Sequence, residues 1–340
     1  MIKNKMFFFS MIFILLSTVL YSSDVRQYFD YAYPFSEGLA CAAINDVNGI
    51  GEYGFVDKSG KMVIEPLFSD AYPFSEGLAC VKIYGMYGYI DKSGRMVIKP
   101  QFDNARPFSG GLARVEIKDK YAFIDKSGKT IFNQFYNTAF SFSEGLAWVI
   151  IKGKYGYIDE KGKIVIEPQF DDAHPFRDGL AGVKISGKYG FVDKSGRMVI
   201  KPQFDDVLFF SEGLAWVSIG GKYGSIDKSG RMIIKPQFQS IPFSYKEGLS
   251  RVLINTKFGF IDKTGKVVIE PQFDNAYCFS EGLACVKING KFGFIDKTGR
   301  VVIKAQYYSA HSFSEGLAWG RTRDGWLIID RKAASLLHGE

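Results

Sequence analysis

Apolar and polar positions alternate in short runs along most of this chain, and one set of runs recurs at a fixed interval. Within 179–212, Gly-Leu-Ala-Gly-Val-Lys-Ile (179–185) and Lys-Tyr-Gly-Phe-Val-Asp (188–193) alternate with the period of two that is typical of β-strands. A third run, 197–200, ends before Pro202, because proline cannot donate a hydrogen bond within a sheet. Short turns containing glycine separate the runs. Each set therefore predicts a three-stranded antiparallel meander, followed by an ordered connection.

One aspartate marks each set. It follows Ile or Val and precedes a turn like Lys-Ser-Gly, and its nine positions are spaced by 34 residues with one step of 35: Asp57, Asp91, Asp125, Asp159, Asp193, Asp227, Asp262, Asp296 and Asp330. This period predicts a tandem repeat array rather than two globular domains. Arrays of paired helices share the period, but the frequent glycines and the lack of any 3.6-residue periodicity exclude them.

Aromatic residues recur at equivalent positions of the units. The first position follows the predicted third strand: Phe29, Phe68, Phe102, Tyr136, Phe170, Phe204, Phe238, Phe273 and Tyr307. The second lies three residues before the glycine of Glu-Gly-Leu: Phe35, Phe74, Phe108, Phe142, Phe176, Phe210, Tyr245, Phe279 and Phe313. A third opens the second strand of each unit, from Tyr53 to Trp326. Aromatic residues at repeat spacing predict a core that also holds the connection in place.

These units resemble the bacterial WG-repeat (KWG-repeat) family over about residues 29–330. Lys154-Tyr155-Gly156, Lys188-Tyr189-Gly190 and Lys222-Tyr223-Gly224 stand where that family has Lys-Trp-Gly, as do two later copies with Phe. The Glu-Gly-Leu and Asp-Lys-Ser-Gly segments also match its pattern. The resemblance implies an interaction module and offers no catalytic residues to carry over.

The two ends of the array are unlike, which leaves two architectures open. Nine first and nine second strands are predicted, but only eight third strands, because the chain continues into Arg331-Lys332 after the last aspartate. We expect an all-β fold in which the units form an elongated, twisted β-solenoid with covered ends. The alternative is a closed ring like a β-propeller, in which an N-terminal segment supplies the missing strand.

The chain ends divide the sequence further. Residues 1–23 are predicted to be a signal peptide, because Lys3 and Lys5 precede the apolar stretch 6–20 and small residues follow it. An uncleaved N-terminal anchor is the alternative. The array is predicted to span 24–332, with a C-terminal cap or tail at 333–340. After cleavage we expect no transmembrane span, and an exported protein that is periplasmic or secreted to the cell surface.

Candidate chemistry is sparse. The repeated aspartates and the glutamates of Glu-Gly-Leu invite a catalytic or calcium-binding role, but nine similar copies lack the asymmetry of an acid–base pair. We expect them to accept main-chain hydrogen bonds. The equivalent residues His174 and His311 lie four repeats apart. Among the four cysteines, spacing argues against a Cys41–Cys80 bond and leaves Cys278–Cys285 open. We therefore expect no enzyme, no cofactor and no metal.

One variable position is a candidate binding surface. The residue after Gly-Leu-Ala or Gly-Leu-Ser differs between units, while its neighbours stay alike. On a strand it points away from those neighbours. Trp and Arg are enriched at binding hot spots, so the candidates are Arg114, Trp148, Trp216, Arg251 and Trp319. The alternative is a second buried face with loose size requirements.

A cationic position forms a second candidate surface, which we call the basic edge. It follows the glycine of the second turn in all eight units with a third strand: Lys61, Arg95, Lys129, Lys163, Arg197, Arg231, Lys266 and Arg300. Exposed tips that prevent edge pairing are one explanation. Multivalent attraction to an anionic polymer is the other.

The pattern as a whole predicts an exported, non-enzymatic binding scaffold of the cell envelope. Its partner is expected to be a protein or an anionic envelope polymer, and the scaffold itself a monomer. Nucleic acid is disfavoured by export, although the chain carries a formal net charge of +7. The competing class is an envelope enzyme, or the accessory carbohydrate-binding module of one.

Overall fold

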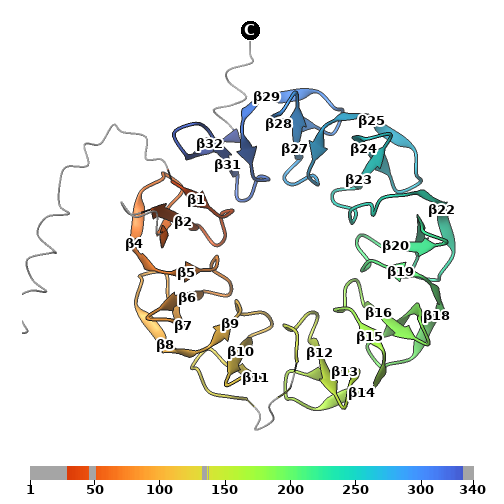
Figure 1. Cartoon of the computed structure of the whole chain (residues 1–340), viewed down its shortest axis with the longest axis horizontal. Coiled ribbons are helices and arrows are strands. Elements are labelled where there is room, and N and C mark those ends of the chain that lie inside the picture. Colours follow the sequence, from red (N-terminus) through yellow and green to blue (C-terminus); the bar gives the residue numbers. More distant parts are fainter. Residues whose placement is uncertain (1–28, 46–50, 132–135, 137, 332–340) are drawn as a thin grey trace, which may run out of the picture.

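The computed structural model describes residues 29–45, 51–131, 136 and 138–331, which form nine antiparallel sheets arranged in a ring (Figure 1). We call the sheets blades 1 to 9 in chain order. The predicted signal peptide (1–23) and the tail at 333–340 lie outside the described residues. None of the helical structure in the described part of the chain is long and apolar enough to span a membrane.

Blade 5 shows how the sequence pattern becomes a sheet. Its strands lie in the order β15 (Asp172–Ala173), β16 (Leu180–Ile185), β17 (Lys188–Asp193) and β18 (Met198–Phe204). The last three are the predicted meander, but the predicted end of the third strand before Pro202 is wrong: β18 continues through Pro202 to Phe204. A proline is compatible with this strand because it lies at the outer edge of the sheet. The first is a short strand formed by the connection, which the alternation of residues did not predict. It lies toward the centre of the ring, whereas β18 lies on the perimeter (Figure 1).

The other blades follow this plan, although blades 4 and 7 have no innermost strand among the described residues. The innermost strands are β1 (Tyr31–Ala32), β5 (Asp70–Ala71), β9 (Asn104–Ala105), β19 (Asp206–Val207), β26 (Asn275–Ala276) and β30 (Ser309–Ala310). The next are β2 (Ala40–Asn45), β6 (Ala79–Ile83), β10 (Ala113–Ile117), β12 (Leu146–Ile151), β20 (Leu214–Ile219), β23 (Leu249–Ile254), β27 (Leu283–Ile288) and β31 (Leu317–Arg321).

Third and outer strands complete the sheets, although blades 3 and 9 have no outer strand among the described residues. The third strands are β3 (Gly51–Val56), β7 (Met86–Ile90), β11 (Lys120–Ile124), β13 (Lys154–Asp159), β21 (Lys222–Asp227), β24 (Lys257–Asp262), β28 (Lys291–Asp296) and β32 (Trp326–Asp330). The outer strands are β4 (Met62–Phe68), β8 (Met96–Phe102), β14 (Ile164–Phe170), β22 (Met232–Phe238), β25 (Val267–Phe273) and β29 (Val301–Tyr307).

The ring closes where the N-terminal segment meets blade 9. The amide of Trp326 donates to the carbonyl of Phe29 at 2.8 Å, and the amide of Phe29 donates back at 3.2 Å. Phe29 thereby takes the place that Phe204 has opposite Tyr189 in blade 5. The all-β repeat fold is confirmed, but the open solenoid that we favoured is corrected to the closed ring that was its alternative. The missing outer strand is replaced from the other end of the chain.

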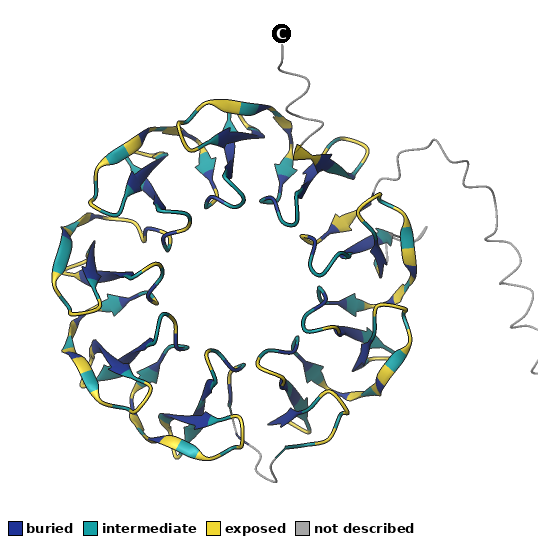
Figure 2. Cartoon of the chain, turned by 180° about the vertical axis from the view of Figure 1, so that it is seen from behind, coloured by how far each residue is buried: buried dark blue, intermediate teal, exposed yellow. Residues whose placement is uncertain are grey.

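Each blade buries both faces of its sheet against its neighbours. The nine core clusters each join two adjacent blades; the one around Phe29, Phe35 and Trp319 joins blade 9 to blade 1. In blade 6, Ala215 and Val217 pack toward blade 5, while Trp216 packs toward blade 7. Buried residues accordingly concentrate in the middle strands, and exposed ones on the outer strands and turns (Figure 2).

Candidate functional site

The variable position after Gly-Leu-Ala or Gly-Leu-Ser faces the next blade rather than solvent. Trp216 and Trp319 are fully buried and Arg251 is 8% exposed, whereas Arg114 and Trp148 are half-buried. The expectation of a solvent-facing column is therefore wrong. It assumed that a sheet has one free face, but blades in a ring are covered on both sides.

The residue at this position on the second strand and the residue opposite it on the third strand complement each other in whether they supply an aromatic ring. Trp216 lies opposite Ser225, and its ring stacks on Tyr245 of blade 7 at 5.6 Å between ring centroids. Trp319 lies opposite Ile328 and stacks on Phe35 of blade 1 at 5.7 Å. In the other seven blades the third strand supplies the aromatic ring at that interface, as Phe191 does against Phe210. All nine interfaces therefore contain an aromatic pair.

The two arginines at this position bind the main chain of the next blade. Nη1 of Arg114 donates to the carbonyl of Ala139 at 2.7 Å, and Arg251 donates to that of Ala276. The Arg251 guanidinium also lies 3.5 Å from the ring centroid of Phe243. Burial lowers the pKa of both arginines. These side chains join blades and are not presented to a partner.

The basic edge lies where the outer strands begin, and all eight of its residues are exposed: Lys61, Arg95, Lys129, Lys163, Arg197, Arg231, Lys266 and Arg300. Its four arginines each pair with the aspartate of their own turn; Nε of Arg197, for example, lies 3.0 Å from Oδ2 of Asp193. The arginine side chains nevertheless remain 76–79% exposed. The edge is therefore accessible, but part of its charge is offset locally.

The repeated aspartates organise the turn before each outer strand. Oδ1 of Asp193 accepts hydrogen bonds from the amide and hydroxyl of Ser195 and from the amide of Arg197, at 2.6–3.1 Å. In seven other turns the aspartate accepts from the amide at the same position. In the turn that follows Asp159, Lys161 stands in place of the serine. The predicted structural role of these aspartates is confirmed.

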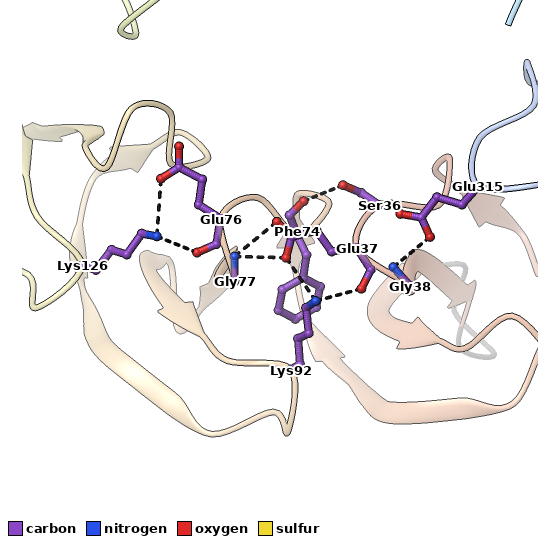
Figure 3. Close-up of polar contacts among 9 residues, drawn as sticks. All are labelled: Ser36, Glu37, Gly38, Phe74, Glu76, Gly77, Lys92, Lys126 and Glu315. Carbon is purple, nitrogen blue, oxygen red and sulfur yellow. Dashed lines mark hydrogen bonds and ion pairs between the residues drawn. The ribbon is translucent and has the colours of Figure 1, made fainter. Parts of the chain in front are cut away.

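A carboxylate–lysine contact near Glu-Gly-Leu joins six of the nine pairs of neighbouring blades (Figure 3). Oε2 of Glu76 accepts from the amide of Gly111 in blade 3 at 2.9 Å, and Nζ of Lys126 binds the carbonyl of Glu76 at 2.8 Å. Between blades 9 and 1, Oε2 of Glu315 accepts from the amide of Gly38 at 2.9 Å and lies 3.0 Å from Nζ of Lys58. Ring closure therefore uses the same contact as most of the internal interfaces.

Three interfaces differ from this contact. Asp178 replaces the glutamate between blades 5 and 6, and Arg331 replaces the lysine between blades 8 and 9. The interface between blades 3 and 4 is altered on both sides. Blade 3 has Gly110 in place of the glutamate, and blade 4 has Glu160 in place of the lysine. A Cβ built on Gly110 would lie 3.0 Å from Oε1 of Glu160, and one on Gly145 would lie 3.9 Å from it. The Glu160 carboxylate thus lies where the missing glutamate would be, so the two substitutions compensate for each other.

The aspartates of the turns before the outer strands predict that the folded protein becomes less stable in acid. Hydrogen bonds from the Ser195 hydroxyl and from the Arg197 side chain lower the pKa of Asp193 to about 2. Equivalent hydrogen bonds lower the pKa of Asp91 and of Asp227 to about 2. Unfolded aspartates titrate near pH ~3.9, so the unfolded chain binds more protons in this range. The stabilisation is complete above pH ~4 and is lost as the pH falls toward about 2. Thermal unfolding between pH 7 and pH 2 would show it; a constant unfolding temperature across pH 4 to 2 would contradict it.

The remaining reactive side chains are dispersed. All four cysteines are free, so the open Cys278–Cys285 pairing is not formed. Burial lowers the pKa of His174 and His311, which lie in different blades. Within the part of the chain that the structure describes, no three His, Cys, Asp or Glu side chains come together as metal ligands would.

Sequence reasoning missed the residues that follow the inner strands. Amides at this position bind the second strand; the amide of Tyr33, for example, donates to Cys41 at 2.8 Å and that of Tyr72 to Cys80 at 2.9 Å. Several of the side chains are exposed aromatics, including Tyr33, Phe140, Phe243 and Tyr277. Their only signal in the sequence was an excess of aromatic residues two positions before the recurring aromatic residue that precedes Glu-Gly-Leu.

This fold and these repeats define a β-propeller of nine blades built from WG-like units. The family model described as "WG containing repeat" matches residues 28–47, 53–87, 87–121, 121–155, 155–189, 189–223, 223–257, 258–292 and 292–326. The chain therefore belongs to the WG-repeat family, as the sequence resemblance indicated.

Similarities outside the family are distant. No curated protein matches the chain. Among solved structures, Hsv2p of Kluyveromyces lactis is 8% identical with a TM-score of 0.42, over 69% of this chain and 92% of that one. The extracellular domain of BT4673 from B. thetaiotaomicron is 12% identical with a TM-score of 0.34. That match covers 93% of this chain and 54% of the other.

Proposed function

We propose that this protein is an exported, non-enzymatic binding scaffold of the cell envelope whose perimeter attracts an anionic polymer. The observation that carries the proposal is the charge on the outer strands. Alternate residues of an extended strand share a face, so Lys201 of β18 lies on the same exposed side as Arg197, which directly precedes that strand. Blades 2, 6 and 8 repeat this pair as Arg95 with Lys99, Arg231 with Lys235, and Arg300 with Lys304.

The charge is unevenly distributed around the ring. Blades 1, 4 and 7 carry a glutamate where blades 2, 5, 6 and 8 have the second cation: Glu65, Glu167 and Glu270. Each exposed cation contributes little by itself and is screened by salt. A rigid ring holds several of them at fixed spacing, so a long polyanion can engage more than one blade at a time.

Export is supported by the N-terminal sequence, in which Lys3 and Lys5 precede an apolar stretch. We expect cleavage close to Ser23, because the apolar stretch of 6–20 is shorter than the ~20 residues that span a bilayer. Mass spectrometry of the protein from its native cells should find a mature N-terminus within a few residues of Asp24. Recovery of intact Met1 in the membrane fraction would show an anchor instead.

Charge reversal on the outer strands tests the perimeter. Lys201→Glu, Lys235→Glu and Lys304→Glu together should weaken binding to dextran sulfate at least tenfold at low salt and flatten its salt dependence. These lysine side chains are exposed, and none of the ion pairs recorded in the described residues involves them, so the ring should stay folded. Binding is measured by calorimetry at 50 and 300 mM salt.

A matched variant separates position from net charge. Lys82→Glu, Lys184→Glu and Lys287→Glu change the net charge equally, but these lysines lie on the second strands, each over an aromatic ring of the third strand. This variant should retain most of the binding once circular dichroism shows that it is folded. Equal loss in both variants, or undiminished binding by the first, would rule out the perimeter as the binding surface.

A further inference from the structure

Tyrosines gather at the inner edge of blades 1 and 2. Tyr31 is 60% exposed and Tyr33 37% exposed, on and just after β1. The ring centroid of Tyr33 lies 6.3 Å from that of Tyr53, which is in the third strand, β3. Tyr72 follows β5 of the next blade and is half-exposed. The short strands β1, β5 and β9, which carry or directly precede the members of this group other than Tyr53, lie toward the centre of the ring (Figure 1).

Two charged side chains of opposite sign belong to the same group. Nη1 of Arg106, which follows β9, donates to the hydroxyl of Tyr72 at 2.7 Å, and its guanidinium lies 5.5 Å from the centroid of that ring. Asp70 on β5 accepts from the hydroxyl of Tyr87 at 2.6 Å. Burial raises the pKa of Tyr33 and Tyr72, and the negative charge of Asp70 adds to that rise.

The group is held rigidly by the main chain. The amides of Tyr33, Tyr72 and Arg106 each donate to the second strand of their own blade, at 2.8, 2.9 and 3.0 Å. Burial raises the pKa of Tyr33 to about 12, so its hydroxyl stays protonated and can donate a hydrogen bond. A ligand would therefore meet aromatic faces and polar groups that are already in place, which lowers the entropic cost of binding.

We propose that Tyr31, Tyr33, Tyr53, Tyr72, Asp70 and Arg106 form a binding site for a neutral sugar chain built of pyranose rings. A pyranose ring has an apolar face of C–H groups that packs on an aromatic ring, and a rim of hydroxyls that both donate and accept hydrogen bonds. The exposed tyrosine rings can pack on the apolar face. The sugar hydroxyls can bond to the phenol hydroxyls, to a carboxylate that only accepts and to a guanidinium with five N–H donors.

The composition of the group favours a sugar over an apolar peptide. Asp70 and Arg106 contribute one charge of each sign, which suits an uncharged ligand rich in hydroxyls. At the equivalent inner-edge positions of blades 4 and 7, Phe140 and Phe243 are exposed but carry no hydroxyl. Those rings stack on Trp148 and Arg251 of their own blades, so one face of each ring is already covered.

Titration of the full chain with three soluble hexasaccharides tests the site: cellohexaose, maltohexaose and the hexamer of N-acetylglucosamine. We expect at least one to bind by calorimetry. Tyr33→Ala and Arg106→Ala should each weaken that binding about tenfold. Tyr33→Phe, which keeps the ring, should weaken it less than Tyr33→Ala and guards against a folding defect in the truncation. The absence of binding to all three sugars by the unaltered protein would overturn the proposal.

The matched control is another exposed tyrosine outside the group. Tyr84, in the turn between β6 and β7, is 95% exposed and has a φ of 51°, so Tyr84→Asn suits its backbone. This variant should bind the sugar as the unaltered protein does; an equal loss there would show nonspecific contact and refute the site. The site does not depend on the perimeter, so the triple outer-strand variant should retain sugar binding even if it loses dextran sulfate.

Discussion

Trp319→Ala should lower the free energy of unfolding by about 3–5 kcal/mol, the range for truncating a large buried aromatic side chain. Trp319 is fully buried in the cluster that joins blade 9 to blade 1. Its ring stacks on Phe35 at 5.7 Å and meets Phe29 edge-on at 5.6 Å. Truncation would therefore remove the aromatic contacts that close the ring, as well as buried apolar area. Chemical denaturation would measure the free energy.

Hydrogen exchange would show where the damage lies. In Trp319→Ala, protection should fall in blade 9 and, across the closure, in β1 and β2. Trp216→Ala is the matched control: it removes the same side chain from the interface between blades 6 and 7, stacked on Tyr245. Its loss of protection should centre on those blades. If β1 and β2 keep full protection in Trp319→Ala, the two chain ends do not pack together in solution.

Gly190→Ala should cost about 3 kcal/mol, at the upper end of the usual range for forcing extra volume into a packed core. Gly190 corresponds to the glycine of the family's Lys-Trp-Gly. The pairing of β17 with β18 is irregular here: Tyr189 lies opposite Phe204, but Phe191 lies opposite Ile200. The bulge brings the outer strand over the glycine, so an added Cβ would meet the carbonyl oxygen of Ile200 at 2.4 Å.

Gly187→Ala is the comparison for this variant. Gly187 has a φ of 82° and open space around its Cα, so alanine there meets backbone strain but no clash, at a cost of about 1 kcal/mol. Urea denaturation of both variants should rank Gly190→Ala as the more destabilised. The reverse order would mean that the outer strand moves away without cost and does not press on the third strand.

The local structure of the unit was predictable from its sequence. Alternation and turn residues predicted β16, β17 and the first part of β18, and the recurrence of Asp193 and its equivalents predicted the turn. These features depend on contacts within one unit. The inner strand β15 was missed because it has two residues, too few for a period of two to appear.

The packing of the blades was not predictable in the same way. Whether Trp216 faces solvent depends on the neighbouring sheet, and alternation along one strand does not show whether its second face is covered. The compensation of Trp216 by Ser225 was present in the sequence, but it becomes visible only when the cross-strand register is known. Ring closure depends on Phe29 and Trp326, far apart in the chain, and no local pattern connects them. The inner-edge tyrosines likewise come together only through the ring.

The pairing of Phe29 with Trp326 also bears on the order of folding. Each internal interface joins units adjacent in the chain and can form as soon as two of them exist, whereas the closing interface requires nearly the whole sequence. Contacts of such long sequence separation form slowly. Until the chain is complete, blade 1 and the last folded blade each expose one apolar face and an unpaired strand. These two ends are the surfaces through which an incomplete ring would associate with another copy.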